Sequence, residues 1–432
     1  MFSVLQSSEI CMQIPLTKAD LPGPSQARRP SDEFFGAGNP PKFVDRIASR
    51  ADLAINGARP VFAEQLHVGR PNIANRARFL ELVGDMLDRC WLSNDGPLVR
   101  EFERRLARNI GVEHVIAICN GTIALEIAIR ALELTGEVIV PSYTFVATAH
   151  ALHWQGITPV FADIDPETHC LDPESVQSLV TPRTSGVIAV HLWGRPAPIA
   201  ALQSLCAERA LKLVFDAAHA FWASHAGRNI GNFGDCEVFS FHATKFLNSL
   251  EGGAIATNDA GLAAKMRLMR NFGFAGYDNV IHPGTNGKMV EACAAMGIAN
   301  LESIEAIVAA NKRNYEAYAD GLGGLPGLRL LRYDETQRNN RQYIVVEIGP
   351  EYGCTRDEII TVLHAENVLA RRYFWPGCHR MQPYCDLFPS ADAHLPHTND
   401  VAARVIVLPT GMAIGAEEIA TICAILRTLH AS

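Results

Sequence analysis

The chain has 432 residues, of which 48% are hydrophobic and 19% are charged, so it is not a disordered or low-complexity protein and is long enough for two domains. Its 38 Lys and Arg against 46 Asp and Glu give a net charge of −8, which argues against nucleic acid as the main partner. No apolar run approaches the ~20 residues of a membrane helix. The N-terminus lacks a basic segment followed by an apolar run, so we expect no secretory signal and a cytoplasmic location.

Eleven cysteines are scattered along the chain without a CxxC motif or a Cys/His cluster of zinc spacing. This pattern is typical of reduced thiols in a cytosolic enzyme, and we expect no metal site.

Residues 1–60 are rich in Pro, Gly, Ser and Arg, which predicts an N-terminal extension with little core of its own. A large domain is expected over residues 61–310. It begins with two amphipathic helices, at 74–91 and 97–110, the second ending at Gly111 as at a helix C-cap.

Short apolar strands then alternate with helices up to about residue 273. The expected strands are at 114–119, 137–141, 158–164, 185–193, 211–218, 236–243 and 254–259. Apolar runs of this kind are typical of strands buried on both faces, so we predict an α/β fold with a mostly parallel sheet. A long helix from about Met289 to Tyr318 is expected to lead into a smaller C-terminal α/β domain over residues 311–432.

Ligands of open α/β sheets bind at the carboxyl edge of the sheet, so candidate catalytic and binding residues are expected in the loops that follow the strands. Asn120-Gly121-Thr122 precedes a helix and is either an ordinary N-cap or a phosphate cradle formed by free backbone N–H groups. Asp216 ends the apolar run LKLVF, where a carboxylate requires a cationic partner or caps the next turn.

Lys245 lies between Phe241 and Phe246, so partial burial would lower its pKa and free an amine to attack a carbonyl. The alternative is a solvated charge. Ser240, five positions earlier, is a candidate phosphate contact, and Phe145 either stacks on a cofactor or packs in the core. Together these residues supply an amine, a carboxylate, a phosphate cradle and an aromatic face, which a pyridoxal phosphate site requires.

The sequence resembles the pyridoxal-phosphate-dependent sugar aminotransferases of the DegT/DnrJ/EryC1/StrS type over roughly residues 64–430. The segments that carry the resemblance are WLSNDGPLVREFERRLA, NGTIALEIAIRAL, GEVIVPSYTFVATAHAL, GITPVFADIDPETHCLDPESV, VIAVHLWGRP, FDAAHA, GDCEVFSFHATKFLNSLEGGAIATND, GTNGKMVEACAAMGIANLESIE and RRYFWPGCHRMQPY. The family implies a fold-type-I transferase with pyridoxal phosphate as cofactor.

The resemblance implies a role for each matching residue. Lys245 matches the lysine that bonds to the cofactor, Asp216 the acid that pairs with the ring nitrogen, and His219 a position near the phenolic oxygen. The remaining implied cofactor contacts are Asn120 (where Ser is commoner), Gly121, Thr122, Ser240 and Phe145.

Asn286 matches an asparagine that reaches the phosphate from a partner subunit, which implies a homodimer with shared sites. Gly287 and Lys288 stand where many members have Tyr and Arg, so the chain departs from the family pattern there. Candidate contacts to a sugar are His191, Trp193, Lys288, Tyr373 and His379. Trp193 could instead pack in the core, and His379 could form local hydrogen bonds.

The segments VHLWGRP, NGTIALEIAIRAL and FHATKFLNSLEGG resemble those of one branch of the family. Members of this branch transfer an amino group to C4 of dTDP-4-keto-6-deoxyglucose, and L-glutamate is the expected donor. Amination at C3 of another nucleotide-linked keto-sugar, or of a keto-cyclitol, is the alternative. A non-catalytic binding or regulatory protein on the same scaffold would have no need of Lys245. A nicotinamide-dependent dehydrogenase would need a glycine-rich fingerprint, and the sequence contains no GxGxxG.

Overall fold

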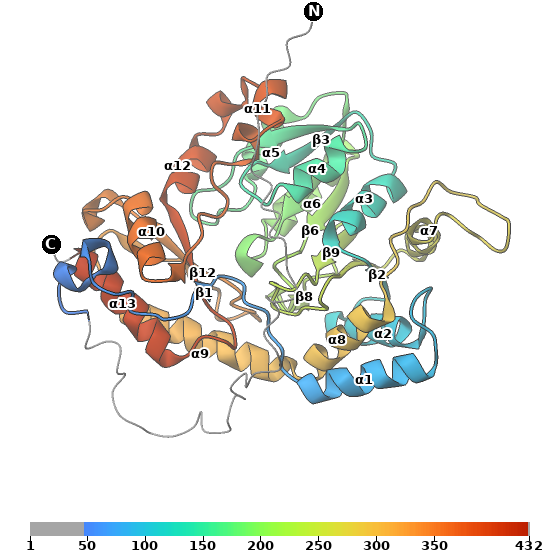
Figure 1. Ribbon diagram of the computed structural model, residues 1–432. Coiled ribbons are helices and arrows are strands. Elements are labelled where there is room, and N and C mark those ends of the chain that lie inside the picture. The colour runs from blue at the N-terminus through green and yellow to red at the C-terminus, as the bar shows by residue number, and fades with distance from the viewer. Residues whose placement is uncertain (1–46, 431–432) are drawn as a thin grey trace, which may run out of the picture. The chain divides into compact units, whose positions relative to one another are not determined.

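The computed structural model describes residues 47–430. Its centre is a seven-stranded sheet in the order β2-β10-β9-β6-β5-β3-β4 (Figure 1). Only β10 runs antiparallel to its neighbours, so the prediction of a mostly parallel sheet is confirmed. The strands are β2 (His114–Ile118), β3 (Glu137–Pro141), β4 (Thr158–Ala162), β5 (Thr184–Val190), β6 (Lys212–Asp216), β9 (Cys236–Ser240) and β10 (Gly253–Thr257).

Helices cover both faces of this sheet, which explains why its strands read as unbroken apolar runs. In β2, Val115 and Ala117 belong to one apolar cluster, whereas Ile116 and Ile118 belong to another on the opposite face. The first cluster includes side chains of α1 (Arg76–Asp88), α2 (Pro97–Ile110), α5 (Pro173–Leu179), α6 (Ile199–Arg209) and α8 (Glu291–Glu302). The second includes side chains of α3 (Gly121–Ala131), α4 (Ala147–His153), α7 (Ala260–Arg270) and α11 (Tyr384–Leu387).

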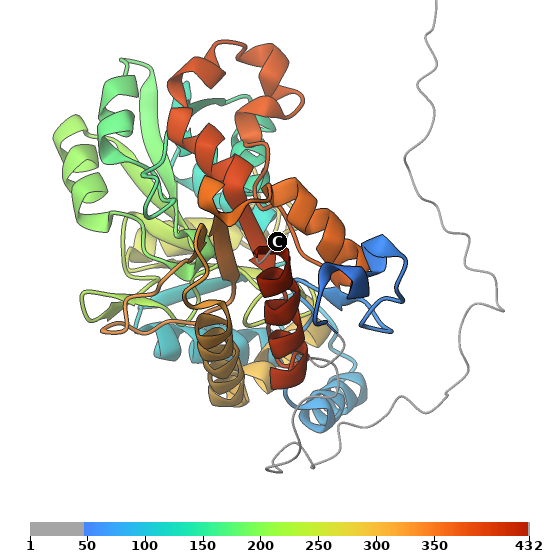
Figure 2. The same ribbon diagram turned by 90° about the vertical axis from the view of Figure 1, so that its left-hand side faces the viewer.

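The C-terminal part has its own antiparallel sheet in the order β11-β12-β14 and a third apolar cluster. Helices α9 and α13 run side by side along it (Figure 2). Its elements are α9 (Ile304–Leu322), β11 (Leu328–Leu330), β12 (Ile344–Ile348), α10 (Arg356–Ala365), β13 (Val368–Leu369), α12 (Pro396–Arg404), β14 (Val405–Leu408) and α13 (Ala416–His430). The short strands β7 (Ser224–His225) and β8 (Arg228–Asn229) form a separate hairpin.

The described part of the expected N-terminal extension, residues 47–60, packs onto the C-terminal cluster. Leu53 is buried there, and the carboxylate of Glu366 accepts backbone hydrogen bonds from Ala54 at 2.6 Å and Val61 at 2.7 Å. Residues 1–46 lie outside the described part. The expected domain limits at residues 60 and 310 stay predictions.

The single long helix expected from Met289 to Tyr318 is wrong, because α8 and α9 meet at Ser303 with a bend of 65°. The apolar residues of α8 belong to the cluster beneath the central sheet, whereas α9 from Tyr315 onward packs in the C-terminal cluster, and one straight helix would not reach both. Among residues 47–430, no single helix is long and apolar enough to cross a membrane, although this bent pair meets that test of length and composition when taken together.

Candidate active site

The carboxyl ends of β6 and β9 and the loop after β2 meet at one edge of the central sheet. Asp216 is the last residue of β6, Ser240 is the last residue of β9, and a Cβ on Gly121 would lie 3.0 Å from the Cβ of Ser240. A Cβ on Gly253 would lie 2.7 Å from the carbonyl carbon of Asn120. The two glycines therefore let α3 begin directly against the sheet.

The N-terminus of helix α3 has a capping side chain, and its first two backbone N–H groups can still bind a ligand. The Oδ1 atom of Asn120 accepts the Ile123 N–H at 2.8 Å, so the expected N-cap is present. Within the described chain no acceptor is bonded to the N–H of Gly121 or Thr122. These amides and the positive end of the helix dipole suit a phosphate group.

Asp216 is buried without an ionic partner among the described residues. Its oxygens accept hydrogen bonds from Thr148 Oγ1 at 2.9 Å and from the Ala218 N–H at 3.1 Å. Burial raises the pKa of Asp216, although both hydrogen bonds and the positive charge of Lys245 oppose this rise. A protonated ring nitrogen would supply the cation that this buried carboxylate lacks.

Lys245 lies in the turn after β9, where its N–H donates to the His242 carbonyl at 2.8 Å. Its side-chain amine has no hydrogen-bond partner among residues 47–430. Burial lowers the pKa of Lys245 to about 8, and the nearby charge of Asp216 opposes this shift. An amine with this pKa is partly neutral near physiological pH and is able to act as a nucleophile or base.

His219 is buried within a stack of aromatic rings. Its ring is nearly parallel to those of Trp193 and Phe374, with interplanar angles of 18° and 9°, and Tyr343 meets it edge-on at 4.9 Å. Burial, with the charge of Lys245 adding to it, lowers the pKa of His219 well below its usual value. Phe374 and Tyr343 were not among the predicted site residues, although Phe374 lies within the segment RRYFWPGCHRMQPY.

Phe145, Asn286 and Lys288 present exposed or half-buried side chains. Phe145 is 58% exposed, so core packing does not account for it. The Nζ atom of Lys288 donates to Asn286 Oδ1 at 2.6 Å and lies 4.6 Å from the centre of the Phe272 ring. Gly287 accepts a hydrogen bond from the Cys119 N–H at 2.8 Å, which holds this segment beside the end of β2.

Three of the candidate sugar contacts are occupied by protein partners. His191 is fully buried, with Nε2 3.0 Å from a Glu237 oxygen and Nδ1 accepting the Ala197 N–H at 2.9 Å. Trp193 is also fully buried, and His379 is bonded through both ring nitrogens, to Ser142 and Asp392.

The geometry therefore favours packing or local hydrogen bonding for His191, Trp193 and His379. Tyr373 is half-buried and stacked on Phe374, and its contact with a sugar stays a prediction.

The residues at this edge fit pyridoxal phosphate. The buried carboxylate of Asp216 suits its ring nitrogen, the amine of Lys245 suits its aldehyde, and the free amides at the start of α3 suit its phosphate.

Several known proteins are similar to this chain. A transaminase of Escherichia coli, dTDP-4-amino-4,6-dideoxy-D-glucose transaminase, is 34% identical over 345 residues, covering 79% of this chain and 92% of the relative. GDP-perosamine synthase of Caulobacter vibrioides is 36% identical over 329 residues, covering 75% and 88% of the two chains. The crystal structure of DesI in the presence of its TDP-sugar product has a TM-score of 0.82 and 49% identity, covering 87% of this chain and 96% of that one.

The model of the DegT/DnrJ/EryC1/StrS aminotransferase family matches residues 74–427, most of the chain. The chain therefore belongs to the DegT/DnrJ/EryC1/StrS aminotransferase family.

Proposed function

We propose that this aminotransferase uses pyridoxal phosphate to move an amino group from L-glutamate to C4 of dTDP-4-keto-6-deoxyglucose. The observation that carries the proposal is the meeting of an unpaired lysine amine, a buried carboxylate and free helix amides at one sheet edge. A binding protein on this scaffold would have no need of the unpaired amine of Lys245.

The residues of the chain divide the chemistry between them. Asp216, oriented by Thr148, would hold a proton on the cofactor's ring nitrogen. The bound cofactor supplies an electron sink for the pair released when the donor's α-carbon loses its proton. Lys245 Nζ in its neutral form would move that proton to C4′ of the cofactor and, after the acceptor binds, would move a proton from C4′ to the sugar carbon that receives the amine. The amides of Gly121 and Thr122, with Ser240, would hold the phosphate and so fix the ring between Asp216 and Lys245.

The choice of acceptor rests on the relatives. The Escherichia coli protein is named for dTDP-4-amino-4,6-dideoxy-D-glucose, the compound that C4 amination of this keto-sugar produces, and the DesI structure was solved with a TDP-sugar product. A relative from Acidithiobacillus ferrooxidans, 32% identical, is named for amination at C3 of a UDP-linked sugar, so a C3 acceptor is the alternative.

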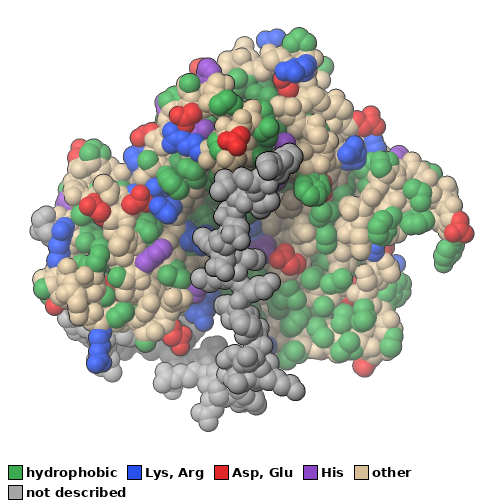
Figure 3. Space-filling view, turned by 45° about the horizontal axis from the view of Figure 1, so that its top comes forward, with side chains coloured by type: hydrophobic (Ala, Val, Ile, Leu, Met, Phe, Trp, Pro, Cys, Tyr) green, Lys and Arg blue, Asp and Glu red, His purple; other side chains and the backbone are tan. Residues whose placement is uncertain are grey.

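We also propose a homodimer in which Asn286 of one subunit reaches the phosphate of the other. The segment 272–285 beyond α7 projects from the domain, with hydrophobic side chains along it (Figures 1 and 3). Phe274, Tyr277 and Ile281 on this segment are 41%, 102% and 53% exposed, a grouping that is typical of surfaces covered by a partner. A cytoplasmic location stays a prediction.

An absorbance titration tests the function. The purified protein with pyridoxal phosphate should show the absorption band of the lysine-bound cofactor, which L-glutamate bleaches and dTDP-4-keto-6-deoxyglucose restores. Bleaching without recovery would contradict the acceptor, and recovery with a 3-keto nucleotide sugar would identify the alternative. Lys245→Ala should show neither the original band nor turnover; full activity in this variant would contradict the mechanism.

A further inference from the structure

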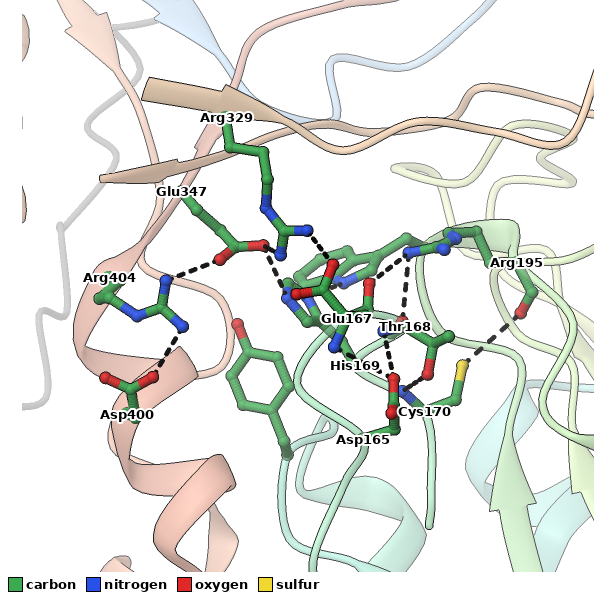
Figure 4. A network of polar contacts seen from close by, with 12 residues as sticks. Asp165, Glu167, Thr168, His169, Cys170, Arg195, Arg329, Glu347, Asp400 and Arg404 are labelled. Atoms are coloured by element: carbon green, nitrogen blue, oxygen red, sulfur yellow. Dashed lines mark hydrogen bonds and ion pairs between the residues drawn. The ribbon is translucent and has the colours of Figure 1, made fainter. Parts of the chain in front are cut away.

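A chain of polar contacts connects the C-terminal sheet to His219, and Figure 4 shows its part around Glu347 and His169. It begins at Glu347 on β12, which is 2% exposed and accepts hydrogen bonds from Arg329 at 2.5 Å and from Arg404 at 2.8 Å. The same carboxylate lies 3.0 Å from Nε2 of His169. Burial alone would raise the pKa of Glu347, yet the hydrogen bond with His169 and the two arginine charges hold that pKa below its ordinary value.

The contacts of His169 determine which of its ring nitrogens carries the proton. The indole N–H of Trp193 lies 3.1 Å from His169 Nδ1, and an indole nitrogen is only a donor. Nδ1 must therefore be bare, and the proton on Nε2 is donated to the carboxylate of Glu347. His169 is 1% exposed, so water does not compete for these positions.

Trp193 is held at each of its polar groups. Besides the indole bond, its carbonyl accepts from the Tyr333 hydroxyl at 3.1 Å, and its backbone N–H donates to Nδ1 of His219 at 3.4 Å. The backbone of Trp193 has φ of 62°, and that of His169 has φ of 61°. Bulky side chains rarely adopt this left-handed conformation, which persists only where the surroundings enforce it.

The position of His219 follows from these contacts. Because Nδ1 accepts the N–H of Trp193, the proton of the neutral ring lies on Nε2, for which no acceptor occurs within residues 47–430. Stacking against Trp193 and Phe374 fixes the ring plane, and Asn340 donates to the His219 carbonyl at 2.7 Å.

We propose that Glu347 and His169 are positioning residues that act through Trp193 to hold His219 with a bare Nδ1 and a protonated Nε2. His219 then presents a hydrogen-bond donor to an oxygen of the bound ligand. The identification of this oxygen as the phenolic oxygen of pyridoxal phosphate rests on the proposed function. The position of the proton on the His219 ring does not.

Nitrogen NMR of protein labelled with ¹⁵N-histidine tests this inference without turnover. The chemical shifts of the ring nitrogens distinguish bare from protonated atoms, and the signals of His219 are identified by their loss in His219→Gln. The expected spectrum of the cofactor-free protein has a bare Nδ1 and a protonated Nε2. A proton on Nδ1 would overturn the proposal at once.

Two variants test the chain of contacts. In Glu347→Gln a neutral amide that can rotate replaces the carboxylate that accepts from His169 Nε2, so the ring of His169 and the indole bonded to it are held less firmly. Trp193→Phe keeps an aromatic ring but removes the indole N–H. Both changes loosen residue 193, so its backbone N–H should no longer stay in place against His219 Nδ1, and the His219 signals should shift toward a mixture of tautomers. Unchanged signals in both folded variants would overturn the proposal. If Glu347→Gln does not fold, Trp193→Phe alone decides.

Asp400→Asn provides the matched control. Asp400 is bonded to Arg404 at 2.7 Å at the exposed outer end of the same network, and it does not contact Glu347 or His169. Its loss should leave the nitrogen signals of His219 unchanged. Failure of the proposed function would appear in the absorbance titration and leave this spectrum as expected, so the two outcomes are distinguishable.

Discussion

At the residue scale, burial shifts the pKa values of Lys245 and Asp216, and the charge of each residue limits the shift of the other. Burial lowers the pKa of the lysine to about 8 and raises that of the carboxyl, while the charge of each residue opposes the shift of the other. The amine is therefore reactive near neutral pH without losing its ability to hold a proton between steps.

The pH dependence of cofactor attachment should report the pKa of Lys245. Only the neutral amine attacks an aldehyde, so borohydride trapping of pyridoxal phosphate on the cofactor-free protein should increase with pH, with a midpoint near 8 for the peptide containing Lys245. Asp216→Asn removes the charge that raises this pKa, so its midpoint should lie lower. Asp235→Asn, whose partner is Lys212 at the surface, is the control. A midpoint above 10 for Lys245 would contradict the burial argument.

At the element scale, the sequence predicts what depends on local pattern. The apolar runs at 211–218 and 236–243 predicted strands and therefore a shared carboxyl edge, although the strands end earlier, at Asp216 and Ser240. The flanking phenylalanines predicted the partial burial of Lys245. The bend at Ser303 was not predictable from periodicity, because apolar spacing continues through both helices while their partners differ. The partner of His191 was missed for a similar reason, since Glu237 lies on a strand separated in sequence.

The aromatic rings that pack on His219 also could not be predicted from the local sequence pattern. Tyr343 and Phe374 come from C-terminal segments whose position over the central sheet is set by tertiary packing. Residues 47–60, which include Leu53, gave no periodic signal, because their helical turns, Arg50–Asp52 and Ala54–Asn56, are only three residues long each.

The contact between α8 and α2 should contribute strongly to stability through Glu291. This fully buried carboxylate accepts the N–H groups of Leu98 at 2.9 Å and Val99 at 2.8 Å, at the start of α2. Glu291→Ala leaves both donors buried and unpaired, so the free energy of unfolding should fall by about 2–4 kcal/mol in denaturant titrations. Glu81→Ala, which removes an exposed partner of Arg78, should cost less than about 0.5 kcal/mol. Equal losses would contradict the capping role.

The start of α3 should depend on the absence of a side chain at residue 253. In Gly253→Ala the new Cβ would lie 2.7 Å from the carbonyl of Asn120 and 2.8 Å from the nitrogen of Gly121, both backbone atoms. The helix N-terminus must then move, and the dissociation constant for pyridoxal phosphate should increase by about tenfold or more, equivalent to about 1.4 kcal/mol. In Gly84→Ala the new Cβ meets no atom within 4 Å, and cofactor affinity should be unchanged.

At the scale of the whole molecule, two groups of exposed apolar side chains are candidates for contact with a second copy of the chain. One is the projecting segment 272–285, and the other lies on α1 and just after it, where Leu80, Leu87 and Leu92 are 47%, 56% and 51% exposed. Exposed apolar surface of this kind favours burial against a second copy of the chain, and a two-fold dimer would bury the same surfaces of both subunits. Asn286 lies at the base of this segment with an exposed side chain, as a residue that serves a neighbouring subunit requires.

Mixed dimers test whether the sites are shared. If each site combines Lys245 of one subunit with Asn286 of the other, a dimer of Lys245→Ala with Asn286→Ala contains one doubly altered site and one intact site. Heterodimers purified through two different tags should then have about half of the wild-type activity, although each parent homodimer has little. As a control, a heterodimer of Lys245→Ala with the wild-type chain should also have about half of the wild-type activity, because one of its two sites is intact. If Asn286 instead serves its own chain, both sites of the mixed dimer carry a defect, and its activity will not exceed that of the parents.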